Sequence, residues 1–543
     1  SYIIILTEIT PPTGKYMLLD APIKLQVTTN TSGEGDDEKF IVESVELIDD
    51  ENHGLVTIDY DEDEIEITAK NEYFDLALRK SITSVAYPDS DDAKITEEET
   101  KDRIPNVLTE GLVNGTSTTA VYQHNKQPVR VYKGQEVIYT LRVYNEGEID
   151  GYAEEITDYL PEWLEFVDDD FNRERGWIQD EGNSKIVRTT NLSQAYEYEN
   201  GVDNLLKARD KVTGDLDYRE IEIKCIVTDD VKSKTIITNI AEISKSVAYD
   251  RVNTLDRDSE TNNVEVPETS EGMSNYRNDE AMSSNAETYI EGQQDDDDFE
   301  KLIVEEFDLA LRKYITDIND DKLLKTKDEK NENNTEIEQD STDEGSSNDD
   351  EVQANEEITT EIADDTKYER EPVIDVTPLK DGTDTTATYT HPKEPVEVSV
   401  DDIITYTIEV YNEGTVDGYA TLIKDTIPEG LEFVKDSEIN KEYRWKLVDE
   451  NDEETDDITK AKYIVSDYLS RDNGEDNIIK AFDGEKLDRK FVQVDFKVIA
   501  KEDWPKVIKN QAQISKDSDE GGKGVKDRDS TTNEWLGEDD EDE

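Results

Sequence analysis

Apolar and polar residues alternate with a period of two along most of the chain. The clearest runs cover residues 137–143, 221–227 and 492–498. Such alternation predicts half-buried β-strands, and helical periodicity is scarce. Turn signals such as NEG, DG and LPE separate the runs. The pattern therefore predicts an all-β fold of tandem Ig-like antiparallel β-sandwiches with acidic loops and linkers.

The chain contains one long unit twice. FDLALRK at 74–80 recurs at 307–313, and DRDSETNN at 256–263 matches DRDSTTN at 527–533. The offset grows along the repeat because the second copy carries an insertion at about 320–365, whose acidic and polar composition is typical of a solvated loop. We therefore expect a partial β module at 1–72, a first repeat at 73–266, an acidic linker at 267–302 and a second repeat at 303–543.

Charge narrows the range of partners. The 543 residues carry 59 Lys and Arg against 138 Asp and Glu, a net charge of −79, with one Cys. A polyanion repels nucleic acid and anionic membrane surfaces, so we expect neither as a partner. One cysteine excludes a disulfide framework, and no apolar run approaches the length of a membrane span. Cationic partners or divalent metal ions fit this charge better.

Three polar residues of the first repeat share strand faces with apolar neighbours. Lys80 lies in phase with the apolar positions of FDLALRK, Asp158 with those of EEITDYLP, and Asn239 with those of TNIAEIS. The second repeat places the same residue types in the same phase, at Lys313, Asp425 and Asn510. We therefore expect each sandwich to hold a lysine, an aspartate and an asparagine facing its core.

This set is the one that an autocatalytic Lys–Asn isopeptide bond requires. Burial favours the neutral, nucleophilic amine and raises the pKa of the carboxyl, which then polarises the amide. The alternative is that all three residues have ordinary structural roles. The lysine would then reach solvent at a strand end, the aspartate would cap a turn before proline, and the asparagine would begin a strand. Asp75 and Asp308 stand at odd spacing from the lysines, so we expect them to point away. The bond forms once, and no motif indicates an enzyme acting on external substrates.

Acidic turns near the end of each repeat are a second candidate site. Their alternating oxygen ligands are typical of calcium binding, although neither has the glycine and terminal glutamate of an EF-hand loop. A solvated acidic turn is the alternative. The cross-link needs no cofactor, so calcium is the one ion that the sequence suggests. The candidate ligands are Asp256, Asp258 and Asn262 in the first repeat and Asp527, Asp529 and Asn533 in the second.

The repeats resemble a known family. The segments VYNEGEIDGYAEEITDYLPEWLEFV and VYNEGTVDGYATLIKDTIPEGLEFV, with NIAEIS and DRDSETNN, resemble the Ig-like repeat of Gram-positive surface proteins called the "DUF eleven" family. FDLALRK is similar to the opening strand of clostridial members. The resemblance covers about 74–263 and 307–533. It implies secretion, association with the cell surface or cell wall, and tandem structural modules.

The first module resembles a collagen-adhesin B-type (Cna-B, pilin-like) domain through TEITPPTGKYMLLD. Carried across, the resemblance makes Glu8 the catalytic acid and Asn71 the acceptor. Pro11 replaces the usual alanine, Lys15 is inserted, and the first strand with its lysine is absent. We expect either that the natural chain begins earlier or that a neighbouring subunit donates a strand into residues 1–72.

Together these features favour a structural repeat protein of an extracellular stalk, filament or pilus-like fibre on a Gram-positive-type bacterium, rigidified by Lys–Asn bonds. Its partners would be neighbouring copies or domains of the same surface protein. One alternative is an adhesin that binds a host protein or glycan through exposed aromatic residues such as Trp163, Trp177, Trp445 and Trp535. Another is a calcium-rigidified spacer array.

Overall fold

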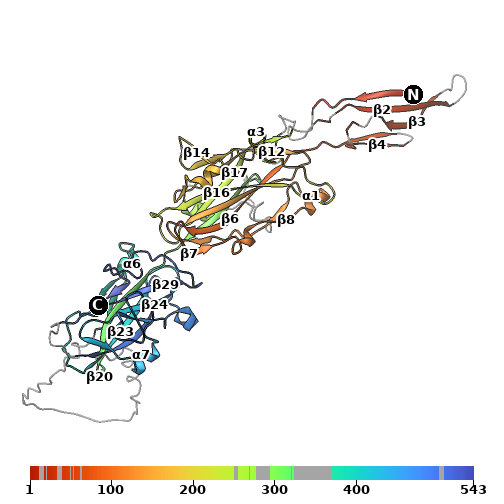
Figure 1. Cartoon of the computed structure of the whole chain (residues 1–543). Helices are drawn as coiled ribbons and strands as arrows, with labels where there is room; N and C mark the ends of the chain where they lie inside the picture. The colour runs from red at the N-terminus through yellow and green to blue at the C-terminus, as the bar shows by residue number, and fades with distance from the viewer. Residues whose placement is uncertain are drawn as a thin grey trace, which may run out of the picture. The chain divides into compact units, whose positions relative to one another are not determined.

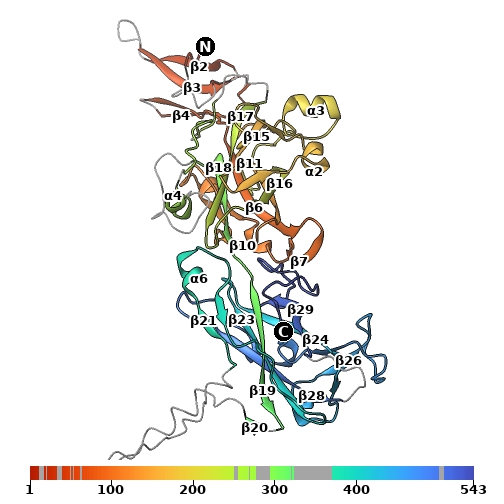
Figure 2. The same cartoon turned by 90° about the vertical axis from the view of Figure 1, so that its left-hand side faces the viewer.

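Strands dominate the computed structural model of the chain, which confirms the predicted all-β fold (Figures 1 and 2). The chain divides into two compact units, Ser1–Glu305 and Glu306–Glu543. None of the helices in the described part of the chain combines the length and apolar character that crossing a bilayer needs. The structure describes residues 1–10, 18–19, 21–32, 39–48, 51–52, 54–61, 64–249, 255–257, 259–267, 269–276, 294–319, 321–322, 370–499 and 507–543.

The N-terminal module, residues 1–72 of the first unit, has two small sheets. The first contains β1 (Tyr2–Leu6), β2 (Ile23–Ser32) and β3 (Lys39–Leu47), and the second contains β4 (Val56–Tyr60) and β5 (Ile65–Ala69). Its core is small and centres on Ile23, Leu25 and Val56. The apolar side chains of β1 are 40–64% exposed. The module therefore leaves a strand with apolar side chains uncovered within the described residues.

The rest of the first unit, residues 73–305, is a β-sandwich that we call the first sandwich. One sheet has the order β13 (Leu164–Phe166), β16 (Tyr218–Val227), β11 (Glu136–Asn145), β6 (Leu76–Tyr87), β7 (Ser90–Ile95). The other has the order β10 (Val129–Val131), β18 (Asp297–Val304), β17 (Ile236–Ala248), β12 (Gly151–Tyr159), β15 (Ile186–Thr189), β14 (Ile178–Gln179). Leu78 and Leu141 from one sheet and Ile156 and Ile243 from the other belong to one buried core. The alternating phase read from the sequence accounts for this burial.

Short elements pack against the strands of the first sandwich. They are β8 (Asn106–Leu108), β9 (Val121–Gln123), the 3-10 turn η2 (Lys101–Arg103), α1 (Glu110–Asn114), α2 (Asp170–Glu174), α3 (Gln194–Asn200) and α4 (Ser270–Asn275). Ser193 and Asp169 cap α3 and α2 by accepting backbone hydrogen bonds, as expected of N-cap residues.

The predicted linker at 267–302 is wrong at its end, because residues 297–302 belong to β18. This strand lies between β10, to which it is parallel, and β17, to which it is antiparallel (Figure 2). Leu302 and Val304 are fully buried in the core, and Glu300 is buried in an ion pair with Arg103. Acidic composition suggested a solvated segment, but basic side chains from elsewhere in the fold compensate these charges.

The second unit repeats this sandwich, and we call it the second sandwich. One sheet has the order β20 (Asp321–Lys322), β19 (Leu309–Ile318), β23 (Ile403–Asn412), β28 (Arg489–Val498), β25 (Leu431–Phe433). The other has the order β26 (Lys446–Val448), β27 (Tyr463–Ser466), β24 (Gly418–Thr426), β29 (Ala512–Asp519), β30 (Glu541–Asp542). The smaller elements are β21 (Val373–Asp375), β22 (Thr388–Thr390), α6 (Thr377–Asp381), α7 (Glu438–Glu442), η5 (Arg471–Asn473) and η6 (Glu475–Asn477). Apart from β20, the insertion expected at about 320–365 lies outside the described residues.

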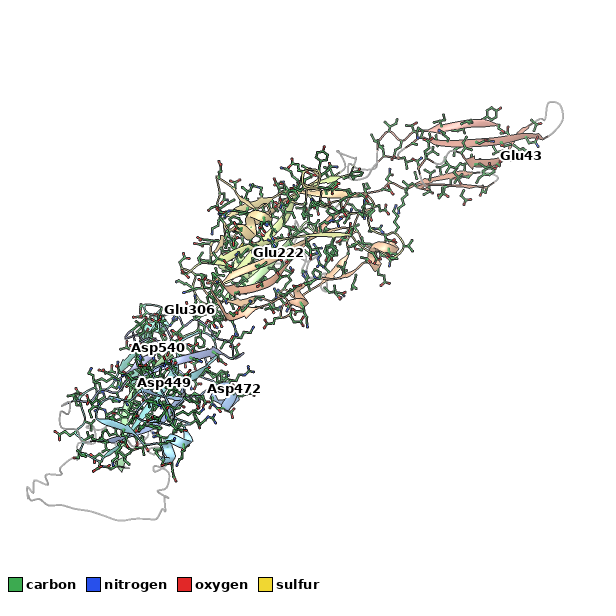
Figure 3. All side chains as sticks on the ribbon, viewed as in Figure 1. Glu43, Glu222, Glu306, Asp449, Asp472 and Asp540 are labelled. Carbon is green, nitrogen blue, oxygen red and sulfur yellow. The ribbon has the colours of Figure 1, made fainter. Side chains whose placement is uncertain are left out.

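Acidic side chains are spread over both units, among them Glu43 and Glu222 in the first and Asp449 and Asp472 in the second (Figure 3). Others, such as Asp158 and Asp308, are fully buried. These buried carboxylates distinguish the candidate sites from the solvated acidic surface.

Candidate cross-link and metal sites

Lys80 reaches across the first sandwich to the facing sheet. It lies on β6, opposite Leu141 of β11, and its side chain is fully buried. Its Nζ forms an ion pair with the carboxylate of Asp158 on β12, whose side chain is also fully buried. The sequence prediction that these two residues face one core is therefore confirmed. Removing such groups from water is costly, so each depends on its partner.

Asn239 lies beside this pair. Asp158 is paired with Ala241 on β17, so Asn239 follows two residues away on the same face of the strand. Its amide influences the pKa values of both the Asp158 carboxyl and the Tyr139 hydroxyl. Among the described residues, neither its Nδ2 nor its Oδ1 makes a hydrogen bond of normal geometry. The three predicted residues of the first repeat thus come together, with the amide uncommitted.

The electrostatics suit a proton shared between the amine and the carboxyl. Burial raises the pKa of Asp158, although the Lys80 ammonium and the Asn239 amide both oppose this shift. In the second sandwich, Lys313 Nζ lies 2.7 Å from Asp425 Oδ2 between fully buried side chains. Burial lowers the pKa of Lys313 and raises that of Asp425 to about 6. Both shifts favour the neutral amine and the neutral acid.

A tyrosine that the sequence analysis did not assign to the site completes each cluster. Lys80 Nζ lies 4.7 Å from the centre of the Tyr139 ring, and Lys313 Nζ lies 4.7 Å from that of Tyr406. Both tyrosines are buried, and each stands at the same place before the VYNEG motif. That recurrence was the signal that could have identified them. The rings shield the lysines from water and contribute a cation–π contact.

Asn510 departs from the pattern of Asn239. It precedes β29, whereas Asn239 lies within β17. Its Oδ1 accepts a hydrogen bond from Thr426 Oγ1 at 2.9 Å, and its Nδ2 has no partner among the described residues. The second repeat therefore brings Lys313 and Asp425 together, while the Asn510 carbonyl is hydrogen-bonded to Thr426.

The N-terminal module contains the pair expected from its Cna-B resemblance. Asn71 Nδ2 donates to both carboxylate oxygens of Glu8 at 3.0 Å, and the Leu19 backbone N–H donates to Glu8 Oε2 at 2.8 Å. No lysine among the described residues forms an ion pair with Glu8. The residues that the resemblance makes acid and acceptor are thus adjacent.

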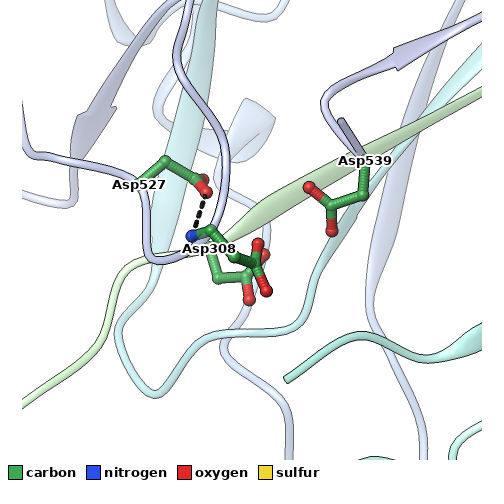
Figure 4. A group of neighbouring side chains, drawn as sticks. Asp308, Asp527 and Asp539 are labelled. Carbon is green, nitrogen blue, oxygen red and sulfur yellow. Dashed lines mark hydrogen bonds between the residues drawn. The ribbon is translucent and has the colours of Figure 1, made fainter. Parts of the chain in front are cut away.

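Each sandwich also gathers acidic residues from three distant segments. In the first, Asp75, Asp256 and Asp295 bring ligand atoms within 4.8 Å of one another, and all three are buried. In the second, Asp308, Asp527, Asp529 and Asp539 bring ligand atoms within the same distance of one another, with Asp308 buried and the other three partly exposed (Figure 4). Asp75 and Asp308 thus point away from the lysines, as predicted. The sequence analysis missed the contribution of Asp295 and Asp539, since both lie in acidic runs that read as solvated.

Nearby cations offset the charge of these carboxylates only in part. Burial and mutual repulsion raise the pKa of Asp527 to about 6 and that of Asp539 to about 9. Arg528 forms an ion pair with Asp308, yet the pKa of Asp308 stays well above its usual value. In the first cluster, Ser259 donates to Asp295 Oδ1 at 2.7 Å, while the buried Oδ2 has no hydrogen-bond partner among the described residues.

The two asparagines among the predicted metal ligands form hydrogen bonds with groups outside the acidic clusters. Asn262 Nδ2 donates to the Ser244 backbone carbonyl, and Asn533 Oδ1 accepts from Lys424 Nζ and Ser515 Oγ. Asp258 lies outside the described residues. Of the predicted metal ligands, Asp256, Asp527 and Asp529 therefore contribute carboxyl groups to the acidic clusters.

Comparisons with known proteins add little. No protein-family model and no curated protein matches the chain, so the two family resemblances stay predictions. Among solved structures, the chain is similar to one titled BspA_C_WT, at 8% identity and a TM-score of 0.24, over 76% of this chain and 94% of that one. It is also similar to a putative membrane anchored protein from Corynebacterium diphtheriae, at 9% identity and a TM-score of 0.15, over 81% and 92% of the two chains. Both TM-scores are too low to carry a statement about function.

Proposed function

We propose that this chain is a structural repeat protein of a bacterial surface stalk, filament or pilus-like fibre, stabilised by isopeptide bonds from Lys80 to Asn239 and from Lys313 to Asn510. The single observation that carries the proposal is the buried ion pair of Lys80 and Asp158 with the uncommitted amide of Asn239 beside it. A merely structural ion pair needs no such amide next to it.

In the proposed reaction, a proton passes from the Lys80 ammonium to Asp158, and the neutral Nζ attacks Cγ of Asn239. A second proton then passes from Nζ through Asp158 to Nδ2, the C–N bond to Nδ2 breaks, the new Nζ–Cγ amide forms, and one ammonia leaves while Asp158 keeps one proton. No oxidant or cofactor is consumed. Because the amide product does not turn over, each site reacts once and the protein is not an enzyme for an external substrate.

The mechanical consequence follows from the positions of the two residues. The link joins β6 to β17, which are separated by 159 residues in the sequence. Tension applied to the ends of the sandwich would then pass through the bond. The segment that the bond encloses would bear no load and would not extend. The acidic surface favours solubility of a repeating fibre.

Residues 1–72 give the fibre a proposed contact between copies. The exposed β1 and the adjacent Glu8 and Asn71 would suit a strand donated by a neighbouring subunit, whose lysine would complete the site. With the sequence resemblance to Gram-positive surface repeats, this favours an extracellular location on the cell surface or in the cell wall.

The adhesin alternative receives less support. Trp177 and Trp445 are 3% and 7% exposed, and their indole N–H groups donate to the backbone carbonyls of Glu222 and Gln493. Trp163 and Trp535 are half-buried. The matched tryptophans therefore serve the core rather than an exposed aromatic patch.

We also propose that the acidic clusters hold a calcium ion in each sandwich. The supporting observation is the recurrence of the same three positions, with a buried Asp295 oxygen that lacks a hydrogen-bond donor. Carboxylate oxygens are the ligands that calcium prefers, and an ion would neutralise the repulsion within each cluster. The ion would tie the start of each first strand to the segments that end the sandwich.

Force spectroscopy of the full chain tests the proposed function. The linked first sandwich should extend less than its Lys80→Ala variant, by roughly 540 Å for 159 residues of stretched chain. Equal extension of the two proteins would refute the mechanical role.

A further inference from the structure

Four acidic residues of the first sandwich, DDDD at 295–298, connect its two sheets, and we call them the acidic clasp. The Leu78 N–H of β6 donates to the Asp295 backbone carbonyl at 2.7 Å. The Ile243 N–H of β17, in the other sheet, donates to the Asp296 backbone carbonyl at 2.9 Å. The clasp thus joins the strand of the proposed nucleophile to the strand of the proposed acceptor.

The clasp also holds the backbone of Lys80. This residue lies on the edge of β6 that β7 leaves open, since β7 pairs with β6 only at Val85 and Tyr87. Asp298 Oδ2 accepts the Lys80 N–H at 2.7 Å. Lys126 Nζ donates to the Lys80 backbone carbonyl at 2.7 Å and to Asp298 Oδ2 at 2.8 Å. Because the side chains of Lys126 and Asp298 are only 2% and 0% exposed, one buried ion pair holds both backbone groups of Lys80.

Asp298 serves this arrangement as an ionised acceptor. Although burial acts to raise its pKa, the charge of Lys126 contributes most to holding that pKa below its ordinary value. Burial instead raises the pKa of Asp158, the proposed acid. The two aspartates near Lys80 therefore have different parts: Asp158 exchanges a proton with the amine, and Asp298 holds the backbone that carries it.

The second sandwich repeats the arrangement. Its clasp is DDED at 539–542, whose first two backbone carbonyls accept N–H groups of β19 and β29 at 2.8 and 2.9 Å. Asp542 Oδ2 accepts the Lys313 N–H at 2.7 Å, and Lys393 Nζ lies 2.5 Å from Asp542 Oδ1. The distance from Lys393 Nζ to the Lys313 backbone carbonyl is 3.5 Å. Both copies thus hold the proposed nucleophile with the same residue types, and the second copy holds it more loosely.

We infer that Lys126 and Asp298, with Lys393 and Asp542 in the second sandwich, are positioning residues that set the rate of the proposed cross-links. The inference rests on the proposed function and names what controls it. Fixing the N–H and the carbonyl of a residue restricts where its long side chain can place the amine. A reacting group displaced by about 1 Å loses roughly a hundredfold in rate.

The time course of ammonia loss in the full chain tests the inference. Intact mass is followed from fresh purification through incubation, and digestion identifies the linked peptides. We expect Lys126→Met to slow the first bond roughly a hundredfold and to leave the second unchanged. Lys393→Met should do the reverse. Lys224→Met, which removes ion pairs with Glu136 and Asp169 of the first sandwich, should leave both rates unchanged.

Two substitutions of Asp298 separate positioning from acid chemistry. Asp298→Asn keeps a side-chain oxygen that accepts the Lys80 N–H, so we expect a rate close to that of wild type. Asp298→Leu removes the acceptor and should slow the first bond as Lys126→Met does. Urea unfolding of each variant on the Lys80→Ala background, where no first bond forms, shows whether the first sandwich is folded.

The outcomes distinguish the inference from the proposed function. A folded Lys126→Met chain that reacts as fast as wild type would overturn the inference alone, and so would equal rates for Asp298→Asn and Asp298→Leu. If neither Lys126→Met nor Asp298→Leu folds, Lys393→Met applies the same test to the second sandwich. A wild type that never loses ammonia would refute the proposed function and the inference together.

Discussion

Lys80 and Asp158 form an ion pair between two sheets of the first sandwich although neither side chain has any solvent exposure. Such a pair rarely stabilises a protein as much as apolar residues of similar size would. Its recurrence at Lys313 and Asp425 therefore favours a chemical role over a purely structural one. Asn239 supplies the third group that this chemistry needs.

Substitution of the proposed catalytic acid, Asp158, separates a chemical role of the site from a packing role. Asp158→Ala leaves Lys80 and Asn239 in place, and we expect it to abolish the first cross-link while the second is unaffected. Loss of a closed loop of this size lowers the free energy of unfolding by about 5 kcal/mol as an upper value. Intact mass and calorimetry check both effects, with Asp425→Ala as the matched variant for the other sandwich. A cross-link that persists in Asp158→Ala would contradict the assigned role.

Calcium should raise the melting temperature of both sandwiches. At a concentration one hundred times the dissociation constant, the gain is about 2.7 kcal/mol per site. We expect Asp295→Asn to remove the calcium response of the first sandwich, whereas Asp168→Asn, at an exposed aspartate, should not. Melting curves with calcium and with a chelator make the comparison. Superimposable curves for the wild type would exclude the metal sites.

The pKa of Asp425 predicts a dependence of stability on pH. Its folded-state pKa is about 6 against an ordinary value of 3.8, so the folded state binds the proton more tightly. The contribution is fully present below about pH 4 and is lost as the pH rises to about 6, because the unfolded state ionises first; it amounts to about 3 kcal/mol. Urea titrations of the uncross-linked Asn510→Ala chain from pH 4 to 7 measure it. Adding Asp425→Asn should flatten the profile in that window, and an unchanged profile would refute the assignment.

The two asparagines predict an asymmetry between the two cross-links. Asn239 is held within β17 opposite Glu300 of β18, whereas Asn510 lies before β29 and its carbonyl accepts a hydrogen bond from Thr426. We therefore expect the second bond to form more slowly than the first. Mass spectrometry over time checks this expectation. Equal rates for both bonds would contradict it.

Much of the first site followed from strand phase alone. A period of two places Lys80, Asp158 and Asn239 on core faces, and register within a sandwich then brings those faces together. Strand phase could not predict that Asp295 and Asp298 are buried, because their contacts come from distant segments: Arg79 donates to the Asp295 backbone carbonyl, and Lys126 forms an ion pair with Asp298. The same limit explains the linker error. The sequence also could not predict that the Asn510 carbonyl accepts a hydrogen bond from Thr426, since this contact depends on how the neighbouring segments pack.

The most direct test of the account is the accurate mass of the denatured full chain, measured beside its Lys80→Ala and Lys313→Ala variants. The account predicts a wild type lighter than its calculated mass by two ammonia molecules once both sites have reacted, and by one in each variant. Glu8 and Asn71 add no third deficit unless a donor supplies the lysine. A wild type at its full calculated mass would contradict the central claim and leave Lys80, Asp158 and Asn239 as buried polar residues without a covalent role.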